Sequence, residues 1–344
     1  MTRGRDAAPR IALVKLSSLG DVIHALPTVR ALRVWWPRAE LTWVVERREQ
    51  AILDGNPDVN HVVPVDTRLW RREFRRPAGA VSVAVKLRGL VRRLARGRFD
   101  VAVDLQGLWK SGLITALTRA PIRVGMSAAH CRERASAWFT NRHVTPPQGV
   151  HVVERYLAVV ASLGVELATV GPPTFSIPGD AAAEAAVAHW LEDEGIKAGT
   201  PLILLNPGSG GDHKRWAVDA FRRLGEELAV RLGVRVGIAW GPGEEPLARA
   251  TAHGMRIGAL VPPPTTIPEM VALFRRATLV IGGDTGPVHV AAALGVPTVG
   301  LYGPTSARRN GPYGPRATTL ESPTGRMDGI SVEAVVAAAQ GLLH

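Results

Sequence analysis

Cysteine is almost absent from this chain of 344 residues, in which Cys131 is the single example. One cysteine can form neither a disulfide within the chain nor a cysteine-based zinc site, and such scarcity is typical of a reducing compartment. The first ten residues are charged and lack the apolar segment of a secretory signal. No apolar run reaches the roughly 18–20 residues that a membrane-spanning helix needs. These absences predict a cytoplasmic protein without a spanning helix.

The chain also lacks the short motifs that mark several enzyme classes. It has no G-x-x-x-x-G-K-[ST] phosphate loop, no G-x-G-x-x-G after a strand, no H-E-x-x-H and no G-x-S-x-G. Kinase-like enzymes, nicotinamide-dependent enzymes, zinc proteases and serine hydrolases are therefore disfavoured.

Positive charge is in excess, and the whole excess lies in the first half of the chain. The net charge is +12. Residues 1–170 contain 27 Lys and Arg against 14 Asp and Glu, a net of +13, whereas the remainder has 15 against 16, a net of −1. A field of that sign attracts phosphates, acidic sugars or an anionic membrane leaflet. Nucleic acid is a weaker alternative, because the chain has no basic-aromatic motif and no recognisable reading helix.

Strands, glycine-marked loops and helices alternate along the chain, which is the pattern of a parallel sheet wrapped by helices. Apolar residues make up 46% of the sequence, enough for two cores. The expected strands are 11–16, 41–45, 101–105, 202–206, 234–239, 279–282 and 298–302. Proline and glycine near 171–179 indicate a linker. We expect two Rossmann-like domains over 1–172 and 173–325, and a helix in 326–344 that can pack back on the first domain.

A short polar loop, from Ser17 to Asp21, follows the first expected strand. In open parallel sheets, ligands bind beside the carboxyl ends of the strands. A carboxylate at that position, at the start of a helix, stays ionised and can accept a proton from a hydroxyl group. Asp21 is therefore a candidate general base, and the alternative interpretation is a helix N-cap.

Two further loops have the composition of an anion site. Residues 206–216 combine small residues, whose amides can approach a phosphate, with the mobile charge of Lys214. In the loop of residues 283–289, Pro287 suits the first helical position, so that the amide of Thr285 points out of the helix start. Asp284 can hold sugar hydroxyls. His289 is either a ligand contact or a packing residue.

Taken in order, these segments resemble glycosyltransferase family 9, the bacterial heptosyltransferases of lipopolysaccharide core synthesis. The matching segments are 14–27, 206–216, 284–289 and 302–305. In the N-terminal half, 68–72, 104–111, 132–133, 141–142 and 151–155 are similar to the heptosyltransferase I subfamily. The second heptosyltransferase usually departs from the Gln-Gly-Leu-x-Lys-Ser pattern found here at 106–111.

The resemblance implies the GT-B fold, an α/β fold in which two Rossmann-like, doubly wound domains face a central cleft. It implies an inverting transferase that moves heptose from ADP-L-glycero-D-manno-heptose to the Kdo residue of Kdo-lipid A in lipopolysaccharide inner-core synthesis. The first domain then binds the acceptor and the second binds the nucleotide sugar. No obligatory metal or other cofactor is implied.

The resemblance also implies partners and a location. The partners are the nucleotide-sugar donor, an anionic lipid A-type acceptor and the cytoplasmic face of the inner membrane, held peripherally, with no nucleic acid. Trp35, Trp36 and Trp70 either assist that membrane contact or belong to the core.

Individual residues receive roles from the same resemblance. By position, Asp21 matches the general base of the family. The implied donor-binding residues are Ser209, Lys214, Glu244, Asp284, Thr285, Gly286 and His289. The implied acceptor-binding residues are Ser18, Arg68, Arg71, Arg72, Gln106, Lys110, Arg132 and Arg142.

Three alternatives remain open at this point. One is another family 9 transferase, of the heptosyltransferase II type or with a different sugar or acceptor. Another is a sugar-nucleotide epimerase or hydrolase on the same architecture, which product analysis would separate. The last is a non-catalytic binder of anionic lipid or nucleic acid, which a thermal-shift screen with ADP, UDP and GDP would separate.

Overall fold

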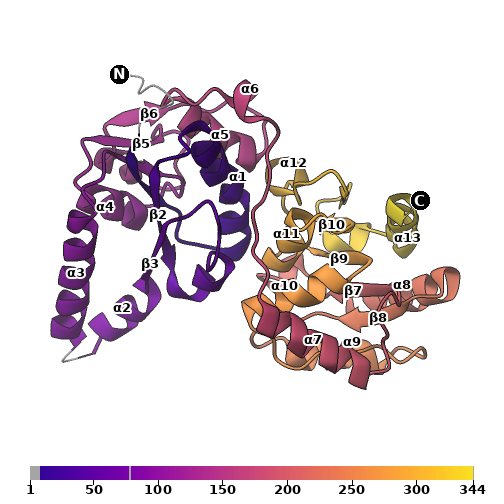
Figure 1. Cartoon of the computed structure of the whole chain (residues 1–344). Helices are drawn as coiled ribbons and strands as arrows, with labels where there is room; N and C mark the ends of the chain where they lie inside the picture. The colour runs from indigo at the N-terminus through magenta and orange to yellow at the C-terminus, as the bar shows by residue number, and fades with distance from the viewer. Residues whose placement is uncertain (1–7, 77–78, 344) are drawn as a thin grey trace. The chain divides into compact units, whose positions relative to one another are not determined.

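The computed structural model describes residues 8–76 and 79–343 of the chain, and they form two compact units (Figure 1). The division falls between Pro178 and Gly179. We call the part up to Pro178 unit 1 and the part from Gly179 unit 2, and each is described by itself.

The division lies a few residues beyond the boundary at residue 172 that the sequence suggested. Ser176 explains the shift, because its hydroxyl donates to Asp58 Oδ2 at 2.6 Å and its carbonyl oxygen accepts from Asn56 Nδ2 at 2.6 Å. The residues from 173 to 178, which the sequence assigned to the second domain, are therefore part of unit 1.

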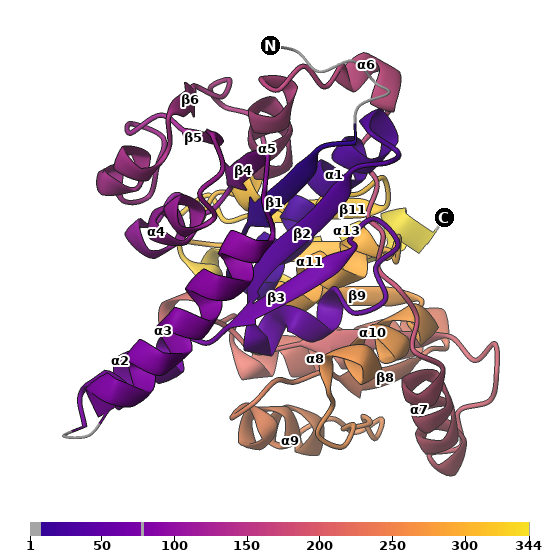
Figure 2. The ribbon, with the colours of Figure 1, turned by 60° about the vertical axis from the view of Figure 1, so that its left-hand side comes forward.

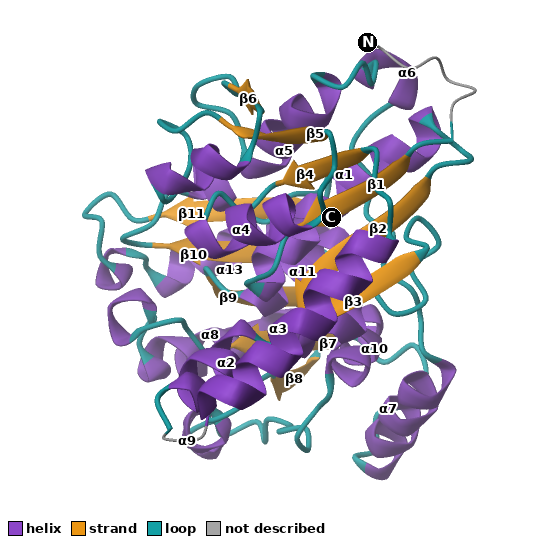
Figure 3. Ribbon diagram, turned by 90° about the vertical axis from the view of Figure 1, so that its left-hand side faces the viewer, coloured by secondary structure: helices purple, strands orange, loops and turns teal. Residues whose placement is uncertain are grey.

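Unit 1 is built on a parallel sheet in the order β3-β2-β1-β4-β5-β6. The strands are β1 (Arg10–Val14), β2 (Glu40–Glu46), β3 (His61–Val65), β4 (Val101–Asp104), β5 (Ile122–Met126) and β6 (Arg142–Val144). The helices are α1 (Leu19–Trp35), α2 (Thr67–Phe74), α3 (Gly79–Arg96), α4 (Trp109–Leu117), α5 (Val152–Ala161) and α6 (Leu167–Val170), with 3-10 turns η1 (Arg47–Ile52) and η2 (Arg134–Phe139). Helices α3 and α4 lie on one face of the sheet and α1 and α5 on the other (Figure 3). Central strands covered on both faces are continuously apolar, as β1 is from Ile11 to Val14.

Unit 2 repeats this design with the strand order β11-β10-β9-β7-β8, again all parallel. The strands are β7 (Leu202–Asn206), β8 (Arg235–Ile238), β9 (Leu279–Gly283), β10 (Thr298–Tyr302) and β11 (Ala317–Glu321). The helices are α7 (Ala181–Asp193), α8 (Val218–Leu232), α9 (Glu245–His253), α10 (Ile267–Arg276), α11 (Gly286–Ala293), α12 (Ala307–Asn310) and α13 (Val332–Leu343), with 3-10 turns η3 (Asp212–Lys214) and η4 (Met327–Gly329).

Each sheet has one point at which the strand order reverses direction. In unit 1 the chain runs from β1 outward to β3 and then returns to β4 on the other side of β1. In unit 2 it runs from β7 to β8 and then places β9 on the other side of β7. The connections on either side of such a point leave in opposite directions and open a crevice at the carboxyl ends of the strands. The crevices are therefore expected between β1 and β4 and between β7 and β9.

The C-terminal helix belongs to the core of unit 2. The sequence allowed residues 326–344 to pack back on the first domain. In the structure, Val332, Val335, Val336 and Ala339 of α13 are buried in a cluster with residues of α8 and β10. The residue His344 lies outside the described part of the chain.

Two of the tryptophans that had two interpretations are core residues. Trp35 and Trp36 are buried, and Trp70 packs partly buried against the core of unit 1. Among the described residues, no helix is both long enough and apolar enough to cross a membrane.

Candidate active site

The loop after β1 leads into α1, whose first turn places Asp21 against a buried cation. Lys15 Nζ lies 3.2 Å from Asp21 Oδ1, and it donates to the Tyr156 hydroxyl at 2.6 Å and to the Leu105 carbonyl oxygen at 3.4 Å. Burial alone would lower the pKa of Lys15, but its interactions with Tyr156 and Asp21 raise that pKa above the ordinary value. Lys15 therefore stays protonated and holds one oxygen of Asp21 in place.

Asp21 is the third residue of α1 rather than its N-cap. Ser18 is the N-cap, and its backbone amide and hydroxyl donate to Asp21 Oδ2 at 3.2 and 3.4 Å. A carboxylate at the third position that closes back on the N-cap is one half of a capping box. The Asp21 side chain is nevertheless 38% exposed. Its orientation is thus fixed by contacts to both oxygens, while one side remains accessible.

Gln106, which follows β4, holds the loop that carries Asp21. Its Oε1 accepts from the backbone amides of Leu16 at 2.8 Å and Ser17 at 3.2 Å, and its Nε2 donates to the Ser17 carbonyl oxygen at 2.6 Å. Both polar atoms of the side chain are engaged with the backbone between β1 and α1. These contacts make Gln106 a positioning residue of the loop, and the acceptor binding that the resemblance implied for it stays a prediction.

Asp104, the last residue of β4, organises the next layer. Its Oδ1 accepts from the amides of Gln106 at 2.8 Å and Gly107 at 3.2 Å, and its Oδ2 accepts from the hydroxyls of Ser111 and Ser136, each at 3.0 Å. Burial raises the pKa of Asp104, and these four donors oppose that rise. A hydrogen-bonded chain thus runs from β4 through Gln106 to the Asp21 loop, across the point where the strand order reverses.

Gly107 makes this turn possible. Its φ is +66°, and a Cβ at this position would approach the Cα of Cys131 to 3.2 Å. Glycine has no Cβ and adopts positive φ readily, so the loop can pass this close to the segment that follows β5.

Several of the basic residues expected to bind an acceptor lie at the ends of neighbouring strands. Lys110, in the first turn of α4, contacts Glu46 Oε1 at 3.2 Å and Thr67 Oγ1 at 3.0 Å. Glu46 ends β2 and Thr67 begins α2, so Lys110 connects three of the loops. On α2, the side chains of Arg68, Arg71 and Arg72 are exposed.

The structure separates Arg132 from Arg142. Arg132 is exposed in the segment after β5, where the amide of Glu133 donates to the Gly107 carbonyl oxygen at 3.0 Å. Arg142 begins β6, the outer strand, three strands from β1 in the sheet. Three inter-strand spacings amount to about 14 Å. Arg132 therefore lies beside the Gln106 loop, whereas Arg142 stands apart from the residues around Asp21.

The loop after β9 in unit 2 carries Asp284, which is paired with two basic side chains. Lys214 Nζ lies 3.0 Å from Asp284 Oδ2, and His289 Nε2 lies 3.6 Å from Asp284 Oδ1. Burial alone would raise the pKa of Asp284, but the hydrogen bonds and charges of His289 and Lys214 lower it to about 2. Asp284 is therefore ionised at neutral pH, and Lys214 keeps further N–H donors for another anion.

Thr285 is the N-cap of α11 and ties the ends of two strands together. Its hydroxyl donates to Asn206 Oδ1 at 3.1 Å, and Asn206 Nδ2 donates to the Ala239 carbonyl oxygen at 3.1 Å. Asn206 ends β7, so this pair spans the reversal point between β7 and β9. Gly286 is the first residue of α11, and the first amides of a helix have no acceptor within it. The start of α11 therefore presents donors that suit a phosphate.

The glycine-rich loop after β7 lies against Glu244. A Cβ on Gly208 would come within 2.2 Å of the Glu244 carboxylate, which accepts from the Gly241 amide at 2.9 Å. Ser209 Oγ donates to the Gly211 carbonyl oxygen at 2.7 Å. All seven residues that the resemblance assigned to the donor thus lie at the carboxyl ends of β7, β8 and β9.

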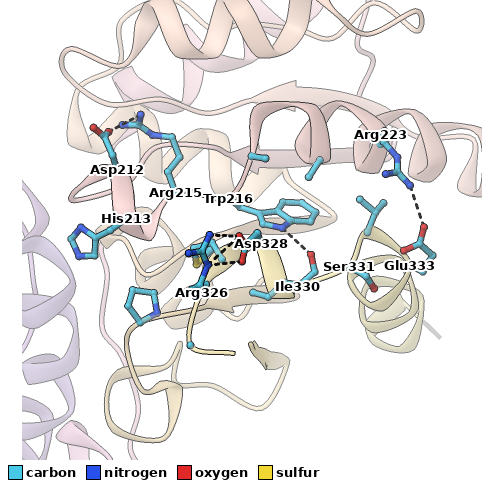
Figure 4. A pocket seen from close by; sticks show the side chains of 16 residues that line it. Asp212, His213, Arg215, Trp216, Arg223, Arg326, Asp328, Ile330, Ser331 and Glu333 are labelled. Atoms are coloured by element: carbon cyan, nitrogen blue, oxygen red, sulfur yellow. Dashed lines mark hydrogen bonds and ion pairs between the residues drawn. The ribbon is translucent and has the colours of Figure 1, made fainter. Parts of the chain in front are cut away.

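A separate cavity of about 720 Å³ opens in unit 2 (Figure 4). Its lining includes Trp216 and three ion pairs: Arg215 with Asp212, Arg223 with Glu333 and Arg326 with Asp328. None of the seven donor residues lines it. The cavity lies beside Lys214 in the sequence, because His213 and Arg215 line it, but its lining does not include the start of α11. Within residues 8–76 and 79–343, no cluster of three or more His, Cys, Asp or Glu side chains could hold a metal ion.

Comparison with known proteins identifies the family. A sequence profile described as "Glycosyltransferase family 9 (heptosyltransferase)" matches residues 87–335. Lipopolysaccharide heptosyltransferase 1 of Escherichia coli K12 is 30% identical over 332 residues, which cover 95% of this chain and 98% of that protein. The chain therefore belongs to glycosyltransferase family 9, and it is an enzyme of the transferase class.

Solved structures agree with this assignment. A family 9 glycosyl transferase from Veillonella parvula superposes with a TM-score of 0.85 at 25% identity and covers 99% of both chains. The E. coli heptosyltransferase WaaC with ADP superposes with a TM-score of 0.78 at 28% identity, covering 96% of this chain and 99% of that chain. The GT-B fold predicted from the sequence is thus confirmed.

Four residues that shape these sites received no role from the sequence: Lys15, Asp104, Tyr156 and Asn206. Lys15 had a usable signal, because it stands between the buried Val14 and Leu16, and a lysine in such a run is buried only when it is paired. Tyr156 had none, since it reaches Lys15 from a helix 141 positions away in the sequence.

Proposed function

We propose that this enzyme transfers heptose from ADP-L-glycero-D-manno-heptose to the Kdo residue of Kdo-lipid A, with inversion at the anomeric carbon. The relatives named heptosyltransferase 1 and the ADP-bound WaaC structure support the donor and the reaction. The observation that carries the chemistry is the accessible Asp21 carboxylate, held by Lys15 and Ser18 at the reversal point of unit 1.

The proposed reaction is a direct displacement. The acceptor hydroxyl oxygen forms a bond to the anomeric carbon of the heptose while the bond from that carbon to the diphosphate oxygen breaks. The hydroxyl proton passes to Asp21, and the electron pair leaves with ADP. Lys15 and Ser18 serve this step by fixing the direction of the Asp21 carboxylate before the substrates react.

Donor binding is assigned to unit 2. Negative charge grows on ADP as it departs, and Lys214 together with the start of α11 would stabilise that charge. Asp284 would accept hydrogen bonds from the sugar hydroxyls, because it is ionised and fixed by its two basic neighbours. Ser209, Glu244, Thr285, Gly286 and His289 complete the proposed donor site.

Acceptor binding is assigned to the strand ends of unit 1. Arg68, Arg71, Arg72, Lys110 and Arg132 offer cations for the carboxylate of Kdo and the phosphates of lipid A, and guanidinium groups bind such anions bidentately. Because that acceptor is anchored in lipid, we propose that the enzyme works peripherally at the cytoplasmic face of the inner membrane. We also propose that transfer needs no metal.

The test is mass spectrometry of products from ADP-heptose and delipidated Kdo-lipid A. The expected product gains one heptose, and its formation is unchanged by a chelator. Free heptose or an isomerised nucleotide sugar would instead favour the hydrolase or epimerase alternative. Transfer only to an acceptor that already bears heptose would favour a heptosyltransferase II activity.

A further inference from the structure

Two helices of unit 1 expose large apolar side chains. Phe74 at the end of α2 is 65% exposed, and Val81 and Val85 on α3 are 72% and 66% exposed. Helices α2 and α3 pack side by side and extend away from the strands of the unit (Figures 1 and 2). Single exposed apolar residues are ordinary, but a group on one projecting pair of helices marks an interaction surface.

The same pair of helices is the most basic part of the chain. We call residues 67–76 and 79–96 the α2–α3 hairpin. It contains ten Lys and Arg against one Asp or Glu, a net of +9 in a chain whose total is +12. The single acid, Glu73, is engaged within the hairpin, because Lys86 Nζ lies 2.6 Å from both of its carboxylate oxygens. The positive charge of the hairpin is therefore almost uncompensated by acidic residues of its own.

The apolar and basic residues of α3 share one face and are ordered along it. Val81, Val85, Arg88 and Arg92 follow each other at intervals of four, three and four positions, which places them on one stripe of a helix. The opposite face holds the buried Leu90 and Leu94 of the unit 1 core. A rise of about 1.5 Å per residue puts Val81 about 16 Å from Arg92 along the axis.

We propose that the α2–α3 hairpin is the element through which this protein binds an anionic lipid bilayer. Phe74, Val81 and Val85 enter the boundary between headgroups and acyl chains, a layer about 5–10 Å deep. Arg88 and Arg92, further along the same stripe, stay at the level of the lipid phosphates. This proposal rests on the proposed function in one respect: a lipid-anchored acceptor explains why the enzyme would bind a membrane.

Charge complementarity and exposed apolar surface together select this partner. A nucleic acid would use the cations but would gain nothing from burying two valines in the same stripe. Residues assigned to the acceptor, Arg68, Arg71 and Arg72, lie on α2, whereas the stripe lies on α3. The α3 stripe is thus distinct from the acceptor residues, although those arginines share α2 with Phe74.

The test is co-sedimentation of the full chain with vesicles of phosphatidylglycerol and phosphatidylcholine, without donor or acceptor. The triple variant Phe74→Ser, Val81→Ser, Val85→Ser is expected to bind at least about tenfold more weakly than wild type. The double variant Arg88→Gln, Arg92→Gln is expected to lose about thirtyfold at low salt, since each cation near the surface contributes a factor of about five. At about 0.5 M salt the wild type should keep residual binding that the triple variant lacks, because salt screens the charges of both proteins and spares only the apolar contacts.

The matched control is Val230→Ser, which changes an aliphatic residue of unit 2 that is 80% exposed. It should bind vesicles like wild type. Unfolding temperatures of all variants are compared to show that they fold. Wild-type binding to pure phosphatidylcholine equal to that with phosphatidylglycerol, or undiminished binding by the folded triple variant, would overturn the proposal. The proposal would also be overturned if the double variant Arg88→Gln, Arg92→Gln lost affinity for DNA but bound vesicles like wild type.

A second readout separates this proposal from the proposed function. Transfer to a delipidated acceptor in solution does not require a membrane, so the triple variant should retain it. If the wild type transfers no heptose to the delipidated acceptor, the result counts against the proposed function and leaves the hairpin proposal intact. Unchanged vesicle binding by the triple variant would count against the hairpin alone.

Discussion

At the residue scale, the organisation of the molecule centres on two carboxylates in contrasting settings. Asp21 has one oxygen on Lys15 and the other on Ser18, yet it remains accessible. Asp284 is largely enclosed between Lys214 and His289, and its pKa is lowered to about 2. The first arrangement suits a group that must receive a proton, and the second suits a group that must keep its charge.

Replacing Asp21 tests the first role. Asp21→Asn keeps the shape and the contact to Lys15 but removes the basic oxygen, so transfer should fall by about 10²–10⁴. ADP affinity, measured by calorimetry, should stay within about twofold because the groups assigned to the diphosphate are in unit 2. An equal loss of ADP binding and transfer would show that Asp21 acts on the structure instead.

Replacing Lys214 tests the proposed binding of the donor diphosphate in unit 2. Lys214→Ala removes a full charge from the proposed diphosphate site and should weaken ADP binding by about tenfold to a hundredfold, the worth of a hydrogen bond to a charged group. Lys197→Ala, at an exposed lysine of the same unit, is the control. A variant at Lys214 that titrates with ADP like wild type would exclude the phosphate role.

Cys131 should be an unreactive thiol. Burial and the nearby charge of Asp104 raise its pKa to about 11, against the influence of Arg155. At pH 8 only about one thiol in a thousand is then ionised, and alkylation by iodoacetamide should be at least about a hundredfold slower than for an ordinary cysteine. The rate should rise about tenfold per pH unit up to pH 10. Val230→Cys in a Cys131→Ser background supplies an exposed thiol for comparison in the same mass-spectrometric assay.

At the scale of elements, the loops after β1 and β4 form one hydrogen-bonded assembly. Asp104 holds the start of the β4 loop, and Gln106 holds the backbone of Leu16 and Ser17. The geometry of the Asp21 loop therefore depends on a strand whose sequence position is about ninety residues away.

Gln106 provides the test of this assembly. Gln106→Ala leaves two backbone amides and a carbonyl oxygen without their side-chain partner, so it should cost about 1–3 kcal/mol of unfolding free energy. Because the loop then holds Asp21 less firmly, kcat should fall while KM for the acceptor changes little. A rise in KM for the acceptor with unchanged kcat would instead favour a direct contact between Gln106 and the acceptor. Gln50→Ala, in η1, is a glutamine control.

At the scale of the whole molecule, the chain is two doubly wound units with their own cores and their own reversal points. Unit 1 has the strand order of the Rossmann sheets that bind dinucleotides, but it lacks their G-x-G-x-x-G motif. At the point where its strand order reverses, it places the carboxylate of Asp21. Unit 2 places the Asn206–Thr285 pair and a helix start there. One architectural rule thus positions two chemically different sites.

The boundary between the units gives a prediction about stability. Ser176→Ala removes a hydroxyl donor from the buried Asp58, which would keep its ion pair with Arg30 at 3.0 Å. Leaving part of a buried carboxylate unsatisfied should cost about 1–3 kcal/mol of unfolding free energy, measured by denaturant titration. Ser162→Ala, in the same unit, is the control because its hydroxyl donates only to the Val159 carbonyl oxygen of its own helix. An unchanged midpoint for Ser176→Ala would mean that the segment before Gly179 is not anchored to unit 1.

Local pattern predicted the central strands and the chemistry-bearing loops, but it missed four outer strands, β3, β5, β6 and β11. The segments 202–206 and 298–302 were predicted with the bounds that the structure shows, because an apolar run between glycine and proline has few other ways to be buried. Helices α2 and α3 were not predicted, since basic residues interrupt their apolar pattern. The packing of α13 could not be read from its own sequence either, because an apolar helix face does not say which core it joins.

The sequence alone determined the family, the two α/β units, and the residue types at the end of each central strand, because these depend on local composition and on motif order. Only the tertiary structure decided that Lys15 and Tyr156 hold Asp21, that Gln106 supports a loop, and that Arg142 lies on the outer strand, three strands from β1. These facts depend on strand order, and strand order is set by packing between segments about a hundred residues apart, which no local pattern encodes.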